Sequence, residues 1–540
     1  MILTFSFIYN TIISRKIQLG QPICTACQKL LFPISDHERM VTMQKFKLFI
    51  NNEWTDAEGG KTFTTENPCT GETIAEMAYA SAADTQKAIA AADAAFRSGC
   101  WSGLDVETRA KYLHRVADIL ESRLEEFARW EAMDTGKPIS ETRTIDIPLA
   151  VRAFHFHADN MKALNGKVIP VPGQPLFDYT SYEPYGVVGS IAPWNFPLHL
   201  LTRSIGAALA AGNTVVCKAA TMTPVTSQLL GEVFLEAGVP AGVYNIVSGS
   251  GSVVGEELLA NDRVAMVALT GSEQVGRQLM ANSSKARHIK PLSLELGGKS
   301  PIIVEPDCDL HGALNSVIQG FCMNQGEVCV STSRLLLADE IYDTFMEKLV
   351  QRVQTIRIGD CLDENTQMGS LISKGHRESV HGFVTRAAEA GAKIACGGEM
   401  LTGAPYDKGC YYPPTIVENV TPDMEIFQEE VFGPVLAVTR YKTVDEAIEL
   451  ANATRFALGA SIFTENIRKM YWMAERVDAG TVWMNCATKS NIETPFGGNR
   501  NSGLGREDGV EGLLEYLKVK NHIWFMGAEY DNMYNMENDC

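Results

Sequence analysis

The sequence predicts an α/β protein with two doubly wound domains and a small additional β-sheet. Apolar runs and helical stretches alternate between Tyr185 and Ser272, which is typical of βαβ units on a parallel sheet. A second alternation starts near Pro301 and continues through 335–350. Extended stretches of mixed polarity at 166–184 and 515–526 interrupt the pattern. With 540 residues, the chain is long enough for this organisation.

The N-terminal segment differs from the rest in charge. Residues 1–35 contain no Asp or Glu, although the whole chain has 65 acidic and 47 basic residues. The apolar run 1–13 is shorter than the roughly 20 residues of a membrane span, and it has no basic start like that of a secretory signal. We predict that residues 1–43 are a leader, and that 1–39 are disordered or result from a mis-assigned start.

The first helices are predicted by a cap and by an apolar stripe. Ser81 with Asp84 fits a capping box before an alanine-rich run. A longer helix follows, with apolar residues three and four positions apart, and Gly136 is expected to end it. The stripe consists of Leu113, Val116, Leu120, Leu124 and Phe127.

Buried strands are predicted at Val187–Ala192, Thr214–Cys217, Val243–Val247 and Val264–Leu269, with a helix at Thr226–Ala237. The glycine pattern Gly249-x-Gly251-x-x-x-Gly255 follows a strand, but its spacing is only a weak sign of dinucleotide binding. We expect a first domain from 44–165 and 185–296, a second from 297–508, and an additional sheet from 166–184 and 509–540.

Composition narrows the possible partners. The formal net charge of −18 argues against nucleic acid or an anionic membrane. The thirteen cysteines run from Cys24 to Cys540, and we interpret most of them as reduced thiols of an intracellular protein. Their spacing predicts no metal site.

Three residues carry candidate chemistry. Cys329 follows a glycine at 326, which leaves room for a ligand, although most free cysteines are small buried hydrophobes. Glu295 lies between two leucines and suits a general base, or alternatively a buried ion pair with Lys299. Asn195, between two aromatic residues and two prolines, suits an oxyanion donor, or alternatively a turn.

These segments, taken in order, resemble the aldehyde dehydrogenase superfamily, and in particular its general and betaine-aldehyde branch. The resemblance covers roughly 46–527 and implies two Rossmann-like domains, one for the cofactor and one for catalysis, with an oligomerisation sheet. The motifs that carry it are 193–197, 269–272, 294–301, 324–330, 429–434, 495–498 and 502–507.

The resemblance implies oxidation of an aldehyde to an acid with NAD or NADP. Cys329 would form a thiohemiacetal and then a thioester, with the oxyanion held by Asn195 and the Cys329 backbone N–H. Glu295 would activate water, which favours hydrolysis over transfer to coenzyme A. The implied cofactor residues are Trp194, Lys218, Thr221, Gly251, Gly271, Ser272, Glu430 and Phe432.

Two positions depart from the pattern of the family. Thr221 replaces the glutamate that commonly repels a 2′-phosphate, so we predict that NADP is accepted. Arg203-Ser204 replaces a frequent Trp-Lys pair, and an arginine in the tunnel disfavours betaine aldehyde. Alternatively, Arg203 turns away into a salt bridge. The implied tunnel residues are Phe196, Arg203, Val328 and Val330.

Two other functions remain open. A semialdehyde dehydrogenase would use Arg203 to bind a distal carboxylate. A protein of another class would keep the fold without catalysis, although Cys329, Glu295 and Asn195 argue against that reading. The resemblance also implies a homodimer or homotetramer, and we expect a cytoplasmic enzyme that acts on a small aldehyde.

Overall fold

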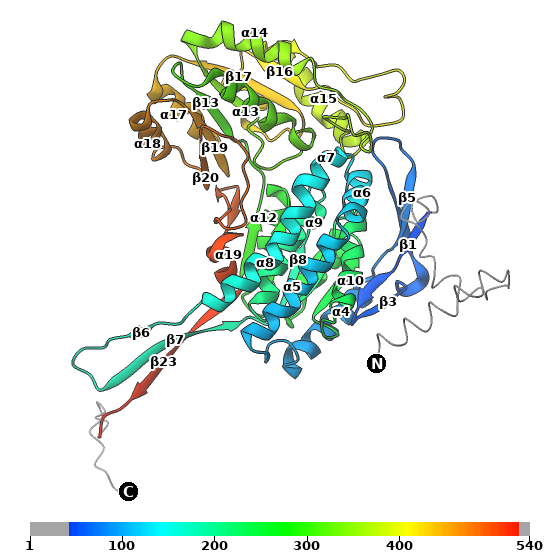
Figure 1. Ribbon diagram of the computed structural model, residues 1–540, viewed down its shortest axis with the longest axis vertical. Helices are drawn as coiled ribbons and strands as arrows, with labels where there is room; N and C mark the ends of the chain where they lie inside the picture. The colour runs from blue at the N-terminus through cyan, green and yellow to red at the C-terminus, as the bar shows by residue number, and fades with distance from the viewer. Residues whose placement is uncertain (1–42, 529–540) are drawn as a thin grey trace, which may run out of the picture. The chain divides into compact units, whose positions relative to one another are not determined.

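The computed structural model describes residues 43–528, so most of the predicted leader and the last residues of the chain lie outside the described part. Residues from Lys45 onward belong to one compact unit, which contains two large sheets (Figure 1). None of the helices in the described part is both long and apolar enough to cross a membrane.

The first large sheet has eight strands and a parallel centre. Strands β12, β11, β8, β9 and β10 are parallel neighbours, while β22, β2 and β3 pair antiparallel at the edges. In sheet order the strands are β22 (Gly503–Leu504), β12 (Leu292–Glu295), β11 (Val264–Thr270), β8 (Val187–Ile191), β9 (Thr214–Ala219), β10 (Tyr244–Ser248), β2 (Leu48–Ile50) and β3 (Glu53–Thr55).

The strand order places a topological switch point at β8. From β8 the chain proceeds to β9 and β10 on one side and then to β11 and β12 on the other. Ligands of doubly wound sheets bind where the connections diverge, beyond the carboxyl ends of the strands. The segments that follow β8 and β11 therefore face a crevice.

Helices of the first domain precede and connect these strands. They are α4 (Ala82–Ser98), α5 (Val106–Ser122), α6 (Leu124–Thr135), α7 (Ile139–Glu141), α8 (Ile147–Ala163), α9 (Pro197–Ala210), α10 (Val225–Glu236), α11 (Glu256–Ala260) and α12 (Glu273–Ser283). The capping box at Ser81 is confirmed, as is the end of α6 at Gly136 with φ 81°.

The single long helix expected to end at Gly136 is wrong. The structure has two helices, α5 and α6, because Arg123 leaves the helical region at φ −106° and ψ 19°. The Arg123 side chain forms ion pairs with Glu126 and Glu232, both at 2.8 Å. The apolar stripe continues across this break, so the sequence pattern alone does not reveal it.

The second large sheet has seven strands, all parallel except at β15. In order they are β15 (Lys393–Cys396), β16 (Thr415–Glu418), β17 (Val435–Tyr441), β14 (Arg334–Ala338), β13 (Pro301–Val304), β19 (Gly459–Phe463) and β20 (Thr481–Met484). Its helices are α13 (Leu310–Cys322), α14 (Tyr342–Val353), α15 (Lys374–Glu389), α16 (Glu425–Gln428), α17 (Val444–Asn452) and α18 (Ile467–Ala474).

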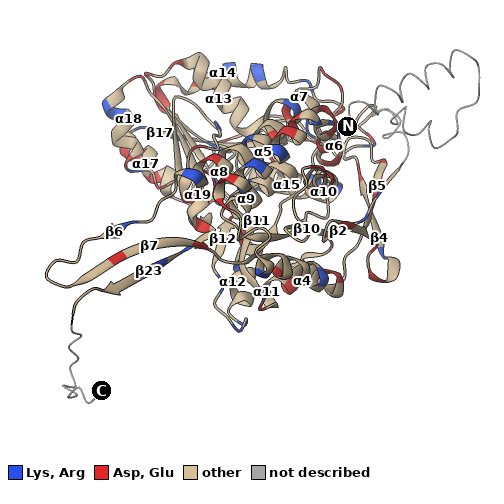
Figure 2. Ribbon diagram, turned by 60° about the horizontal axis from the view of Figure 1, so that its bottom comes forward, with Lys and Arg blue, Asp and Glu red and all other residues tan. Residues whose placement is uncertain are grey.

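Three small sheets complete the structure. Strands β1 (Gln44–Phe46), β5 (Thr73–Ala78) and β4 (Thr62–Glu66) form one of them, and β18 (Phe456–Ala457) pairs with β21 (Asn499–Arg500). The third is an arm of β23 (Leu517–Phe525), β7 (Leu176–Pro184) and β6 (Val168–Ile169), which projects from the large sheets (Figure 2).

The predicted extended segments therefore pair in one sheet, with Leu517 opposite Pro184 and Phe525 opposite Leu176. Within the expected oligomerisation segment 509–540, however, Gly509–Glu515 forms helix α19. Strand β22 also joins the first sheet, although the proposed domain division assigns it to the second domain. A two-residue strand is too short to show a period in the sequence.

Candidate active site

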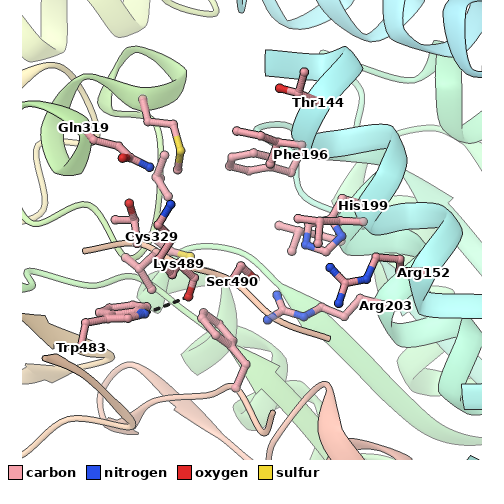
Figure 3. Close-up of a pocket in the computed structure, with 18 residues that line it drawn as sticks. Thr144, Arg152, Phe196, His199, Arg203, Gln319, Cys329, Trp483, Lys489 and Ser490 are labelled. Carbon is pink, nitrogen blue, oxygen red and sulfur yellow. Dashed lines mark hydrogen bonds between the residues drawn. The ribbon is translucent and has the colours of Figure 1, made fainter. Parts of the chain in front are cut away.

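Two cavities meet at Cys329. A tunnel of about 290 Å³ approaches from one side and a cleft of about 510 Å³ from the other. Cys329 and Leu200 line both cavities. Figure 3 shows the tunnel, with Phe196 and Arg203 on one wall and Cys329 on the other. A thiol at this junction can contact ligands in both spaces.

The loop before Cys329 has an unusual backbone. Asn324, Gln325 and Gly326 have φ angles of 47°, 53° and 73°, in the left-handed region that favours glycine. A Cβ atom on Gly326 would lie 2.3 Å from the carbonyl oxygen of Gly433, so no larger residue fits there. The sequence expectation of close approach near Cys329 is explained by this backbone contact rather than by a ligand.

The Cys329 thiol lies in apolar surroundings. Burial raises the pKa of the thiol to about 12, while the positive charge of Arg203 acts in the opposite direction. Only the thiolate is nucleophilic, so reaction at Cys329 requires a nearby group that accepts its proton.

Glu295 is a buried carboxylate whose charge acts on Cys329, although it lines neither cavity. It ends β12, is 3% exposed, and neither carboxylate oxygen has a hydrogen-bond partner among the described residues. Burial, and after it the charge of Glu507, raises the pKa of Glu295 well above its usual value. Within the described part of the chain, the alternative ion pair between Glu295 and Lys299 is not formed, and the Lys299 amine also has no hydrogen-bond partner. Such a carboxylate suits proton transfer.

Asn195 follows β8 and is held from several sides. Its Nδ2 donates to the Glu327 carbonyl at 2.9 Å, and one amide hydrogen is left for another acceptor. The backbone carbonyl of Asn195 accepts hydrogen bonds from Lys137 Nζ at 2.7 Å and from Asn324 Nδ2 at 3.1 Å. Lys137 is fully buried and pairs with Asp146 at 2.9 Å.

Lys137 was missed as a site residue. The sequence Gly136-Lys137-Pro138 indicates the end of a helix, and it gives no indication that the Lys137 side chain reaches the active site. A lysine directly after a helix-terminating glycine in a largely buried segment is the signal that would have drawn attention to it.

The cleft lies at the switch point and is lined by every residue expected to bind a cofactor. These are Trp194, Lys218, Thr221, Gly251, Gly271, Ser272, Glu430 and Phe432. The segments after β8, β9 and β11 supply most of them, as the topology requires. The structure thus brings together residues that are far apart in the sequence.

The polar groups of the cleft fit a dinucleotide. Ser272 caps α12, and a helix N-terminus stabilises a pyrophosphate. Among the described residues, the Lys218 amine donates a hydrogen bond only to the neighbouring Ala219 carbonyl, and burial lowers its pKa to about 8. Glu430 accepts from the Gly298 N–H at 2.9 Å, and a Cβ atom on Gly297 would lie 2.4 Å from its other oxygen. These groups can bind ribose hydroxyls and phosphates.

His376 is a second residue that was missed. Its Nε2 lies 2.7 Å from the carbonyl oxygen of Phe432, a residue with φ 56°. The Trp194 ring is edge-on to both His376 and Phe432, with ring centroids 5.7 and 5.2 Å apart. His376 comes from α15, and no motif in the sequence links this helix to the cleft.

The four predicted tunnel residues, Phe196, Arg203, Val328 and Val330, all line the tunnel. Arg203 is also in a salt bridge: its Nε lies 2.8 Å from Asp508 Oδ2 and 3.3 Å from Glu507 Oε2. Arg203 therefore lines the tunnel and is also paired with two acids, so it has not turned away from the tunnel into its salt bridge.

Comparison with known proteins gives the same grouping. Residues 54–522 match the aldehyde dehydrogenase family. The chain belongs to this family.

Family membership extends to relatives with different substrates. Retinal dehydrogenase 2 of Gallus gallus is 40% identical over 475 residues, which cover 88% of this chain and 90% of the relative. The NAD+ complex of aldehyde dehydrogenase from Bacillus cereus has a TM-score of 0.88 at 37% identity, covering 91% of this chain and 98% of that one.

The NAD-dependent aldehyde dehydrogenase from Sinorhizobium meliloti also has a TM-score of 0.88, at 38% identity, with 91% of this chain and 97% of that one covered. These findings confirm the recognition of the family, the fold class and the assignment as an oxidoreductase of the aldehyde dehydrogenase type. One relative is named for retinal and the others for no particular aldehyde. Membership of the family therefore does not identify the aldehyde that this chain oxidises.

Proposed function

We propose that this aldehyde dehydrogenase oxidises a small aldehyde to a carboxylic acid with NAD+ or NADP+. The observation that supports the proposal is the meeting of the tunnel and the cleft at Cys329. An aldehyde in the tunnel and a nicotinamide in the cleft would both reach this sulfur. When bound, the nicotinamide cofactor supplies the hydride acceptor.

The residues of this chain would perform the remaining steps. The Cys329 thiolate attacks the carbonyl carbon, and the Asn195 amide with the Cys329 N–H holds the oxyanion of the thiohemiacetal. Oxidation of that carbon leaves a thioester on Cys329. Glu295 then takes a proton from water, which attacks the thioester, releases the acid and returns the thiolate.

The substrate is tested with a panel of aldehydes. The lining of the tunnel is mostly apolar near Cys329, and the Nε of Arg203 is already paired with two carboxylates. We therefore expect propanal and benzaldehyde to be oxidised with a higher kcat/KM than succinic semialdehyde. A preference for succinic semialdehyde would favour the semialdehyde alternative, and inactivity with every aldehyde and both cofactors would favour the non-catalytic one.

Cofactor choice is predicted from Thr221. The Thr221 hydroxyl bonds to the Gly249 carbonyl at 3.1 Å, at the wall of the cleft. Without a carboxylate there, we expect the kcat/KM values for NAD+ and NADP+ to differ by less than about a thousandfold, or roughly 4 kcal/mol. Thr221→Glu should lower kcat/KM for NADP+ at least about tenfold through charge repulsion and change that for NAD+ much less.

Thr221→Gln is the matched control for this prediction, because it has nearly the same size as glutamate and no charge. Equal losses with glutamine and glutamate would mean that size rather than charge excludes the 2′-phosphate. A larger preference of the parent enzyme for NAD+ would contradict the prediction for Thr221.

We also propose that the arm forms a homodimer or homotetramer. Strand β23 exposes Val519 and Ile523, each 62% exposed, on one face. An apolar strand face of this kind favours association with another copy. Val519 and Ile523 lie on the same face of the strand, so Val519→Glu with Ile523→Glu should lower the molar mass measured by light scattering.

Lys518→Glu on the opposite face is the control and should leave the molar mass unchanged. A parent chain that is monomeric at all concentrations would contradict the proposed role of the arm. We further propose a cytoplasmic location, supported by ten free cysteines among the described residues, and the domain division at 296/297, supported by the two separate large sheets.

A further inference from the structure

Arg203, which lines the tunnel across from Cys329 (Figure 3), belongs to a buried ion cluster. The cluster consists of Arg203 and three carboxylates from two segments, Glu295 and the adjacent Glu507 and Asp508. Each of these residues is at most 3% exposed. A buried charge is costly unless paired. Arg203 supplies the ion pairs to Glu507 and Asp508, and the charge of Arg506 acts on Glu295 as well.

We propose that Arg203 is a positioning residue of this active site, which fixes Glu507 and Asp508 behind Glu295 and keeps a positive charge beside the Cys329 thiol. The inference rests on the proposed function only for the roles of Cys329 and Glu295. It assigns Arg203 to the catalytic chemistry rather than to the substrate.

The geometry around Arg203 fixes its side chain. Its Nε donates to Asp508 Oδ2 at 2.8 Å and lies 3.3 Å from Glu507 Oε2. The guanidinium carbon lies 4.1 Å from the centre of the Phe496 ring, a cation–π contact. Asp508 has φ 56°, so Arg203 holds an acid whose backbone is strained. A side chain engaged in this way is poorly placed to follow a mobile substrate carboxylate.

The cluster has fewer cations than carboxyl groups, so not every carboxyl group can be ionised at once. Both Glu295 oxygens, Glu507 Oε2 and Asp508 Oδ1 lack hydrogen-bond partners among the described residues. Burial raises the pKa of Glu507 to about 7 and that of Asp508 to about 6, and the Arg203 charge limits both shifts. Without Arg203, these acids would retain protons at neutral pH, and Glu295 would have a less suitable environment as a base.

Three titratable groups near Arg203 are uncharged at neutral pH. His157 on α8 and His199 on α9 are buried, and burial together with Arg203 lowers the pKa of His157 to about 3 and that of His199 well below its usual value. Tyr516 after α19 is buried as well, and its pKa is raised. Arg203 is thus the cation that acts on Cys329 from this side.

The test follows alkylation of Cys329 by iodoacetamide in the full chain, quantified on the Cys329 peptide by mass spectrometry across pH. For Arg203→Met we expect the midpoint of the rate profile to rise by about one pH unit and the rate at neutral pH to fall about tenfold. Arg203→Lys keeps the charge and should restore the midpoint to within a few tenths of a pH unit of the parent.

A matched control exists in Arg123, which also lies between two carboxylates, Glu126 and Glu232, and over a phenylalanine ring, that of Phe127. It lies outside both cavities. Arg123→Met should leave the alkylation profile of Cys329 unchanged. A shift of equal size with Arg123→Met would show that loss of any such ion pair loosens the site, and would overturn the proposal.

A second variant covers the risk that Arg203→Met does not fold with two acids left unpaired. The double variant Arg203→Met with Asp508→Asn removes the closest acid together with the cation, and it should show the same shift of the midpoint. A parent-like alkylation profile in either variant, with a native circular dichroism spectrum, overturns the proposal.

Steady-state kinetics give an independent result. If Arg203 positions the catalytic groups, Arg203→Met lowers kcat for propanal and succinic semialdehyde alike. If Arg203 binds a substrate carboxylate instead, KM rises for succinic semialdehyde alone, and the proposal fails. Alkylation needs no aldehyde turnover, so the thiol result stands even if the proposed function of the enzyme fails.

Discussion

Cys329→Ala is expected to abolish the formation of reduced nicotinamide with every aldehyde, a loss of at least about 10⁴-fold in kcat. The reason is that, within residues 43–528, no other thiol lines the tunnel or the cleft. Without the thioester route, the enzyme retains binding and an oxyanion site but has no nucleophile. The rate is measured from the absorbance of reduced nicotinamide.

Cys322→Ala is the matched control. Cys322 ends α13 only seven positions before Cys329, is buried, and lines neither cavity. It should keep parent-like kcat. Cys329→Ala should also keep the rise in Tm that NAD+ produces, because its fold and cleft are intact. Turnover of Cys329→Ala at the parent rate would refute the proposed covalent route.

Glu295→Gln has the second largest expected effect. The variant should release about one equivalent of reduced nicotinamide per site in a burst and then turn over at least about a hundredfold more slowly than the parent. Glutamine keeps the shape of the side chain but cannot take a proton from water, so the thioester accumulates on Cys329. Rapid mixing separates the burst from the steady rate.

The pH profile and an added nucleophile sharpen this prediction. The pKa of Glu295 is raised, so the fraction of the carboxylate form grows as pH rises, and deacylation in the parent should accelerate with pH. The glutamine variant should lose that dependence. Hydroxylamine needs no base to attack a thioester and should restore turnover of Glu295→Gln. Steady turnover at the parent rate would assign water activation to another group.

The sequence predicts the fold to the extent that burial is periodic. The strands at β8 to β11 are confirmed to within one or two residues, because runs of buried apolar residues have few other readings. The break between α5 and α6 was not foreseen, since it depends on the backbone of one residue, Arg123. The edge strand β22 depends on pairing with β12, which no local pattern encodes.

The sequence predicts those residues of the candidate site that lie within motifs of the family. Cys329, Glu295 and Asn195 come from three different segments, and the structure places Cys329 at the junction and Asn195 along the cleft. The supporting residues Lys137 and His376 lie outside these motifs. Their roles depend on tertiary contacts with the Asn195 and Phe432 carbonyls, and such contacts leave no spacing in the sequence.

The two cavities share only Cys329 and Leu200 among their lining residues. Substitutions that reshape the tunnel can therefore retune which aldehyde is accepted without disturbing the dinucleotide, and changes in the cleft can exchange one dinucleotide for the other without altering the aldehyde. Natural variation and laboratory evolution can thus act on the two specificities as separate traits. The same nucleophilic cysteine can therefore act with many combinations of aldehyde and dinucleotide.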